Sequence, residues 1–156
     1  MTGVTRRTAF EIAMRTLGLS LPAGAIAVAR RYSEDEGSRC AEDLLDRHPD
    51  VTALLCSNDR LAVGAIAAVQ ARGLTCPDDI PISGFNDIPF LDLIPLGLTT
   101  VQVLQFDVGR IAAEILLKPM TEPEVRVPKT TIMPVAIVER SSIASPRLNH
   151  ASAAAE

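Results

Sequence analysis

Apolar runs of strand length alternate along this chain with longer segments whose apolar residues recur at helical spacing. Residues 51–56 (VTALLC) are a continuous apolar run, and similar runs follow at 80–85 and 99–103. Strands that are apolar on both faces are typical of a parallel sheet covered by helices on each side. The alternation therefore predicts an α/β fold with three layers, α/β/α, in which a mainly parallel sheet is joined by right-handed crossovers.

Helix caps and breakers set the expected bounds of these elements. Gly18, Pro49 and Gly73 can each end a helix, and Pro81 predicts that its strand starts late or lies at an edge. We expect helices at 5–17, 34–48, 61–71 and 105–118, strands at 25–29, 51–56, 80–85, 99–103 and 132–138, and a disordered tail over 141–156.

Composition excludes several classes of function. The net charge of -4 argues against DNA binding by this chain alone, because duplex affinity comes largely from Lys and Arg at phosphates. Cys40, Cys56 and Cys76 are an odd number with wide spacing, so neither a disulfide framework nor a metal site is predicted, and no cofactor is expected. No export signal and no apolar stretch of ~20 residues is seen, which favours a cytoplasmic protein with no membrane partner.

Three polar loops follow expected strands at their carboxyl ends. They hold Arg, Tyr and Ser at 30–33, Ser, Asn and Asp at 57–59, and Asn and Asp at 86–87. Ligands of doubly wound sheets sit at these strand ends. Amide and carboxylate groups bond in fixed directions, Arg offers a planar fork, and an aromatic face covers a ring. We therefore expect the loops to converge on a site for a small polyhydroxylated ligand.

A set of motifs occurs in order over roughly a hundred residues, which is more specific than any lone short match. They are SNDRLAVGA at 57–65, GL at 73–74 with PDDI at 77–80, GFNDIP at 84–89, LTTV at 98–101, and GR at 109–110 with AA at 112–113. This run resembles the C-terminal effector-binding region of LacI/GalR (lac-repressor-like) transcriptional regulators. RRTAF at 6–10 resembles a further family step, with Ala9 in place of the usual glycine.

The resemblance implies a class I periplasmic-binding-protein-like fold with two lobes, an effector such as a sugar in the cleft between them, and a homodimer bound to an operator. It implies ligand contacts at Arg6, Tyr32, Asn58 and Asn86, with Asp59 and Asp87 as further contacts or their structural neighbours. Asn86 stands where many relatives have Asp. Val103 stands where relatives often carry a polar residue, so one contact is expected to differ.

The resemblance also divides the chain. Residues 1–145 correspond to the C-terminal lobe, 146–156 to a flexible tail, and 104–127 to a crossover that would pack on an N-terminal lobe. That lobe and the helix-turn-helix head that reaches DNA are not expected in these 156 residues.

Two surfaces are expected to favour pairing of chains. The apolar stripe of the helix at 105–118, with Phe106, Ile111, Ile115 and Leu116, would lack its partner, so we expect the chain to self-associate or this helix to be repositioned. The resemblance implies a dimer surface at Leu61, Phe90, Leu91, Leu93 and Ile94, most of it in an apolar loop expected to be exposed.

Other functions stay open from the residues alone. A periplasmic sugar-binding protein shares the fold, and a small α/β enzyme would use Cys56 or Asp59. No GxSxG elbow, GxGxxG loop or HExxH helix supports catalysis, and a packed core thiol is the ordinary role of a residue like Cys56. A helix cap is likewise the ordinary role of Asn58. We therefore predict a ligand-sensing protein and not an enzyme.

Overall fold

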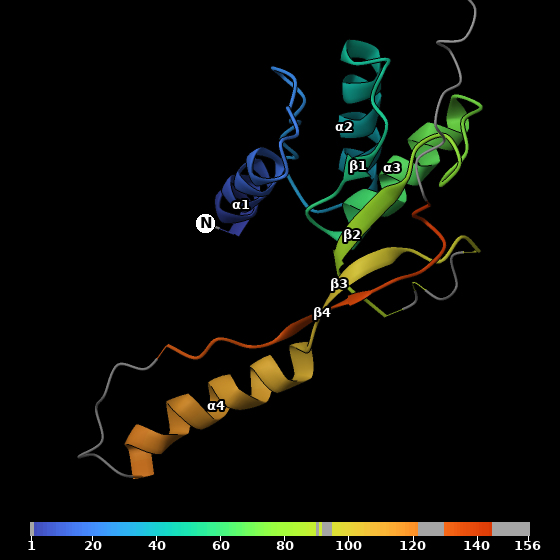
Figure 1. Ribbon diagram of the computed structural model, residues 1–156. Coiled ribbons are helices and arrows are strands. Elements are labelled where there is room, and N and C mark those ends of the chain that lie inside the picture. Colours follow the sequence, from blue (N-terminus) through green and yellow to red (C-terminus); the bar gives the residue numbers. More distant parts are fainter. Residues whose placement is uncertain (1, 90, 92–94, 122–129, 145–156) are drawn as a thin grey trace, which may run out of the picture.

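The computed structural model describes residues 2–89, 91, 95–121 and 130–144. Its elements are α1 (Thr2–Thr16), α2 (Glu34–Arg47), β1 (Leu54–Leu55), α3 (Asp59–Ala71), β2 (Ile82–Asn86), β3 (Thr99–Val103), α4 (Gln105–Thr121) and β4 (Val135–Val138). The strands form one sheet in the order β1-β2-β3-β4 (Figure 1). The first three strands are parallel and β4 is antiparallel to β3, which confirms the predicted mainly parallel α/β fold.

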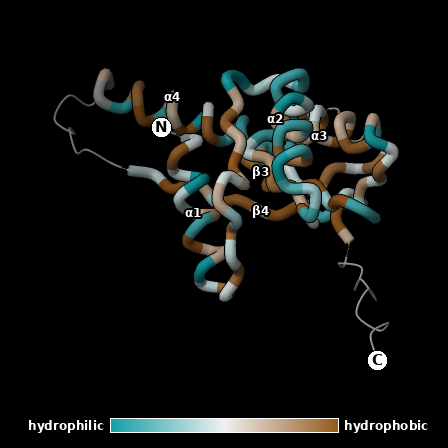
Figure 2. Tube along the Cα trace, turned by 90° about the horizontal axis from the view of Figure 1, so that it is seen from above, coloured by the Kyte–Doolittle hydropathy of each residue, from teal (hydrophilic) through white to brown (hydrophobic). Residues whose placement is uncertain are grey.

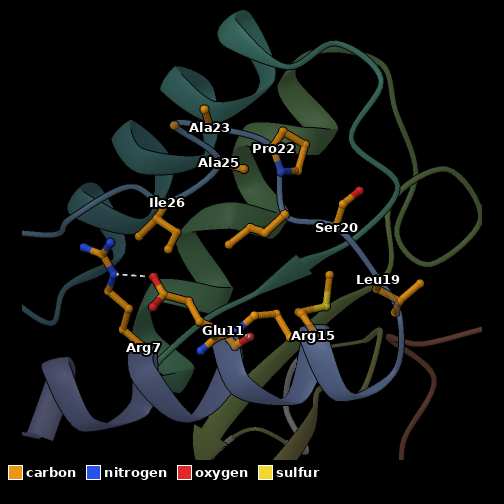
Figure 3. Close-up of a pocket in the computed structure, with 12 residues that line it drawn as sticks. Arg7, Glu11, Arg15, Leu19, Ser20, Pro22, Ala23, Ala25 and Ile26 are labelled. Atoms are coloured by element: carbon orange, nitrogen blue, oxygen red, sulfur yellow. Dashed lines mark hydrogen bonds and ion pairs between the residues drawn. The ribbon is translucent and has the colours of Figure 1, made fainter.

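The sheet lies between α1 on one face and the pair α2 and α3 on the other, as the side chains of β2 show. Gly84 faces Asp59 at the start of α3, whereas the next residue, Phe85, lies under the guanidinium of Arg6 in α1. Successive side chains of a strand point to opposite faces, so α1 and α3 cover opposite faces of β2. Figures 1 and 3 show the same arrangement, and it gives the three expected layers.

The core lies between α3, α2 and the first three strands. Small residues along α3 bring it close to its neighbours, and Ala62, Val69, Ile82 and Leu98 are all fully buried. A Cβ at Gly64 would overlap the backbone carbonyl of Glu34 in α2. Close packing of this kind leaves no room for larger residues where the two helices meet.

The strand expected at 25–29 does not form. Side chains of α2 take up backbone groups there: Arg39 donates to the carbonyl of Val28, Arg47 donates to that of Gly24, and Glu36 accepts from the N–H of Arg30 at 2.7 Å. The described sheet ends at β1, whose two residues pair only with β2. The run was predicted as a buried strand, but Val28 is 74% exposed and the backbone partners here are helix side chains and not a neighbouring strand.

The tail was predicted to be disordered from Ser141, and that is wrong for Ser142, which is fully buried. Its carbonyl accepts from Ile82 N, its N–H donates to Gly97 O, and its hydroxyl donates to Ile82 O at 2.6 Å and accepts from Thr99 N at 2.8 Å. Four hydrogen bonds therefore join this residue to β2, to the first residue of β3 and to the loop before β3. The tail proposed at 146–156 lies outside the described residues.

Two residues expected at a dimer surface are buried inside the chain. Leu91 is 3% exposed and belongs to the core, and Leu61 is 7% exposed where α3 meets α2. The expectation that Leu91 lies on the surface is therefore wrong, because its side chain finds apolar neighbours in its own chain. Phe90, Leu93 and Ile94 lie outside the described residues.

The long apolar helix expected at 105–118 forms as α4 and leaves the body of the molecule beyond β4 (Figure 1). Phe106 and Leu116 are 82% and 70% exposed. Within the described ranges no helix is both long and apolar enough to cross a membrane.

Candidate functional site

Arg6 connects the carboxyl ends of β1 and β2. Its Nη1 donates to the carbonyl of Ser57 at 2.6 Å, and its guanidinium carbon lies 3.7 Å from the centre of the Phe85 ring. Ser57 precedes Asn58 and Phe85 precedes Asn86, so one side chain of α1 touches the neighbours of both asparagines. The structure therefore brings Arg6, Asn58 and Asn86, predicted from separate motifs, to one place.

Tyr32 joins this group from the loop before α2. Its hydroxyl lies 3.8 Å from the position that a Cβ on Gly3 would occupy, one helical turn before Arg6. The side chain is 46% exposed, so part of its ring surface is open to solvent. An exposed aromatic face beside an arginine is suited to covering a sugar or another ring.

Asn58 has the ordinary role that its position suggests, because it caps α3. Its Oδ1 accepts from the N–H of Arg60 at 2.8 Å, and its backbone is extended, as expected for an N-cap. The residue is 8% exposed. The cap uses Oδ1 and not Nδ2, so capping is compatible with donation of a hydrogen bond from the amide to a ligand.

Asn86 and Asp87 adopt an uncommon backbone conformation, with φ angles of 122° and 56°. Such angles in residues other than glycine store strain and must be held by their surroundings. The carboxylate of Asp87 supplies that hold, because it accepts from Gln102 Nε2 at 2.8 Å and pairs with Arg140 Nη2 at 2.9 Å. Asp87 thus orients the half-buried Asn86 and is occupied by protein partners.

Asp59 is a fully buried carboxylate whose oxygens bond to protein groups. It accepts from the hydroxyl of Thr100 at 2.5 Å and from the N–H of Ile88 at 2.9 Å. Gly84 is required beside it, since a Cβ there would overlap Asp59 Oδ1. Asp59 therefore ties α3 to β3 and to the loop after β2, which is the structural alternative that the sequence left open for it.

Sequence reasoning missed Gln102 and Arg140, which support the site from behind. Besides its pair with Asp87, Arg140 donates from Nη1 to the carbonyl of Leu98 at 2.8 Å. The two residues lie on β3 and just after β4, which are adjacent only in the folded sheet. The sequence signal was weak, because Arg140 stands at the edge of a stretch that looked like a tail.

Burial disfavours thiol chemistry at this edge of the sheet. It raises the pKa of the Cys56 thiol to about 12, so the thiol is protonated at neutral pH and is a poor nucleophile. Burial also raises the pKa of Cys40. Among the described residues no group of three or more His, Cys, Asp or Glu side chains is placed to hold a metal ion.

A hollow of about 510 Å³ lies between α1 and the segment after it (Figure 3). Its wall includes Met14, Ile26 and the ion pair of Arg7 with Glu11, whose atoms are 2.8 Å apart. None of the four expected ligand contacts lines it. The hollow and the residue group around Arg6 are therefore distinct features.

Comparisons with known proteins cover nearly the whole chain. Residues 2–143 match a family model described as a periplasmic binding protein-like domain. The chain is 33% identical over 144 residues to the HTH-type transcriptional repressor PurR of Haemophilus influenzae, and the match spans 90% of this chain but 42% of the relative. Other curated relatives are likewise named as repressors, among them the ribose operon repressor of Halalkalibacterium halodurans, which is 33% identical over 60% of this chain and 28% of that relative.

Solved structures give the same picture. A LacI-family transcriptional regulatory protein from Corynebacterium glutamicum matches with a TM-score of 0.75 and 33% identity, over 93% of this chain and 54% of that one. A LacI family regulator from Enterococcus faecium with bound ribose matches with a TM-score of 0.67 and 29% identity, over 73% of this chain and 41% of that one. This chain thus spans about half of each protein or less.

Proposed function

We propose a function from the family to which this chain belongs, the periplasmic binding protein-like domain family and, within it, the LacI-type transcriptional regulators. The chain forms one wall of an effector site for a sugar-like molecule. The observation that carries the proposal is the position of Arg6, bound to Ser57 and stacked on Phe85 between the two asparagines. Effector binding would change operator binding by a full-length regulator through a shift between two states.

The chemistry of the group fits a polyhydroxylated ligand. Arg6 has further N–H donors beyond the one given to Ser57, and Asn58 and Asn86 each offer donors and acceptors. Tyr32 supplies a partly exposed ring. We assign Arg6, Tyr32, Asn58 and Asn86 to ligand contact, and Asp59 and Asp87 to holding the loops that carry them.

Two further parts of the proposal concern the whole regulator. DNA contact would come from a domain outside these residues, because this chain carries a net charge of -4. The regulator would act as a homodimer, and of the surface expected from the family resemblance only Phe90, Leu93 and Ile94 remain candidates, since Leu61 and Leu91 are buried.

An NMR titration of the chain with D-ribose, D-glucose and cellobiose tests the ligand assignment. We expect at least one sugar to shift the amide signals of Tyr32, Asn58 and Asn86. Binding should be weak, because this lobe supplies only one side of the site. No shift with any of the three sugars, or shifts confined to the hollow beside Met14, would contradict the assignment.

A matched pair of variants on α1 sharpens this test. Arg6→Ala should weaken sugar binding by about tenfold or more, as expected for loss of a charged hydrogen-bond donor. Arg7→Ala removes the neighbouring arginine, which pairs with Glu11 of the same helix. Equal loss of binding in the two variants would show that helix α1, and not the Arg6 side chain, matters.

A further inference from the structure

Arg6 differs from three other arginines near the site in the kind of partner that it has. Each of those three pairs with an acidic side chain, at 2.5, 2.8 and 2.9 Å: Arg31 with Asp35, Arg60 with Glu34, and Arg140 with Asp87. Arg6 instead bonds to the carbonyl of Ser57 and lies over the ring of Phe85, which are both uncharged. Within the described residues no carboxylate therefore balances the charge of Arg6.

The two carboxylates at the strand ends are turned to other partners. Asp59 faces Gly84 on one side of β2. Arg6 lies over Phe85, the next residue, and so on the other side of the strand. Figures 1 and 2 agree with this, since α1 and α3 lie on opposite sides of the strands. Asp87 is held in an ion pair of its own. The charge of Arg6 is thus left for a ligand.

The hydrogen-bonding groups around Arg6 are also unequal, because acceptors are used and donors remain. The carbonyl of Ser57 accepts from Arg6, and Oδ1 of Asn58 accepts from the N–H of Arg60. The amide Nδ2 of Asn58 and the other N–H groups of Arg6 are given no acceptor by the described residues. A carboxylate only accepts, whereas a hydroxyl also donates. The free donors therefore favour a ligand that carries a carboxylate.

The guanidinium of Arg6 is held in a way that suits such a group. One Nη1 bond of 2.6 Å and a ring 3.7 Å away fix it on two sides, and the residue is partly buried. A guanidinium can donate two parallel hydrogen bonds to the two oxygens of a carboxylate. Its single charge matches one carboxylate, whereas a phosphate ester brings ~1.5 to 2 negative charges.

We propose, resting on the effector site assigned above, that its ligand is a sugar acid, a polyhydroxylated molecule with one carboxylate. Arg6 binds the carboxylate, and Asn58 and Asn86 bind hydroxyl groups. Asn86 sets the preference for charge. It follows Phe85, the ring on which Arg6 lies, so a carboxylate in its place would neutralise Arg6 and repel an acid.

An NMR titration with D-glucuronate, D-glucose and D-glucose 6-phosphate tests the proposal, because the three differ only at the sixth carbon. We expect D-glucuronate to shift the amide signals of Tyr32, Asn58 and Asn86 and to bind about tenfold more tightly than D-glucose, as a charged hydrogen-bond pair should. This preference should shrink when the salt is raised from ~20 to ~200 mM, since exposed charges are screened.

The other outcomes separate this proposal from the one on which it rests. D-Glucose bound as tightly as D-glucuronate, at the same three residues, would overturn the sugar acid and leave the effector site standing. D-Glucose 6-phosphate bound more tightly than D-glucuronate would overturn the carboxylate in favour of a phosphate. If neither D-glucose nor D-glucuronate shifts these signals, the effector site and the sugar acid both fail.

A matched pair of variants tests the role of Asn86. Asn86→Asp exchanges an amide for a carboxylate of the same shape and should abolish the tenfold preference for D-glucuronate over D-glucose. Gln70→Glu makes the same exchange at an exposed position near the end of α3 farthest from Asn58, and it should keep the preference. A preference that survives in Asn86→Asp, or that both variants lose alike, would overturn the assignment of Asn86.

Discussion

Helices α3 and α4 are both rich in apolar residues, yet only α3 is part of the core. Eight residues of α3 are buried, including Ala62 and Val69, which have no exposed surface. On α4 the large apolar residues Phe106, Leu116 and Met120 are each at least 70% exposed. The difference teaches that an apolar stripe predicts a helix with a partner, but where that partner lies is decided by the rest of the fold.

Two isoleucines, one on β2 and one on β4, should show the largest difference in what each contributes to stability. Ile82 on β2 is fully buried, whereas Ile137 on β4 is 71% exposed. Ile82→Ala should lower the free energy of unfolding by about 4 kcal/mol through lost packing and a cavity. Ile137→Ala should change it by about 0.5 kcal/mol or less. Urea unfolding followed by circular dichroism measures both, and similar losses would contradict the contrast between the two strands.

A buried aspartate at α3 and a partly exposed one at α4 should also differ in their contribution to stability. Asp59→Ala should cost about 3 kcal/mol, because it leaves the buried hydroxyl of Thr100 and the N–H of Ile88 without their acceptor. Asp107→Ala removes an aspartate from the start of α4, where it pairs with a half-exposed Arg110. That loss should be about 0.5 kcal/mol. Urea unfolding measures the loss of stability in both variants. A small loss for Asp59→Ala would mean that the loop after β2 rearranges without lowering the free energy of unfolding.

A pair of glycine substitutions tests the packing of the two helices directly. Gly64→Ala should destabilise by about 2 kcal/mol, since its Cβ would overlap the Glu34 carbonyl and force α2 and α3 apart. Gly109→Ala meets nothing within 4 Å and should stabilise the isolated chain by ~0.5 to 1 kcal/mol through helix propensity. Thermal melts of both variants and of the unchanged chain compare their stabilities. Stability changes of the same sign in the two variants would contradict the predicted difference between α3 and α4.

The smallest effect is expected from pH, and it belongs to the packed half of the molecule. Hydrogen bonds from Arg39 and from the Arg30 N–H lower the pKa of Glu36 from 4.5 to about 2. The stability that this carboxylate contributes is present above about pH 4.5 and is lost as the pH falls from there towards 2. Glu36→Gln should flatten the acid limb of unfolding measured from pH 7 to 2. An unchanged profile would show that Glu36 does not contribute.

Most of the elements could be predicted from local pattern. The helices at α2, α3 and α4 and the strand at β3 lie within a few residues of their expected bounds, and β2 begins after Pro81, as its missing N–H required. The segment 25–29 has an equally strand-like composition, but α2 side chains bond its backbone. Composition does not report which groups satisfy the backbone.

The candidate site divides in the same way. Side chains that follow strands were predicted to converge, and Arg6 does contact the neighbours of Asn58 and Asn86. The residues that support them, Gln102 and Arg140, come from β3 and the end of β4. No local pattern links these positions to Asp87, because the link depends on strand pairing.

By itself the sequence determined the fold class, the order of the elements and the residue types gathered at the strand ends, since all of these follow from periodicity and short motifs. Only the tertiary structure decided that Ser142 is buried at β2, that Leu91 belongs to the core and that Phe106, Leu116 and Met120 of α4 are exposed. Burial and hydrogen-bond partners come from contacts between residues far apart in the chain. A sequence pattern specifies that a side chain needs a partner, and the fold determines which one it finds.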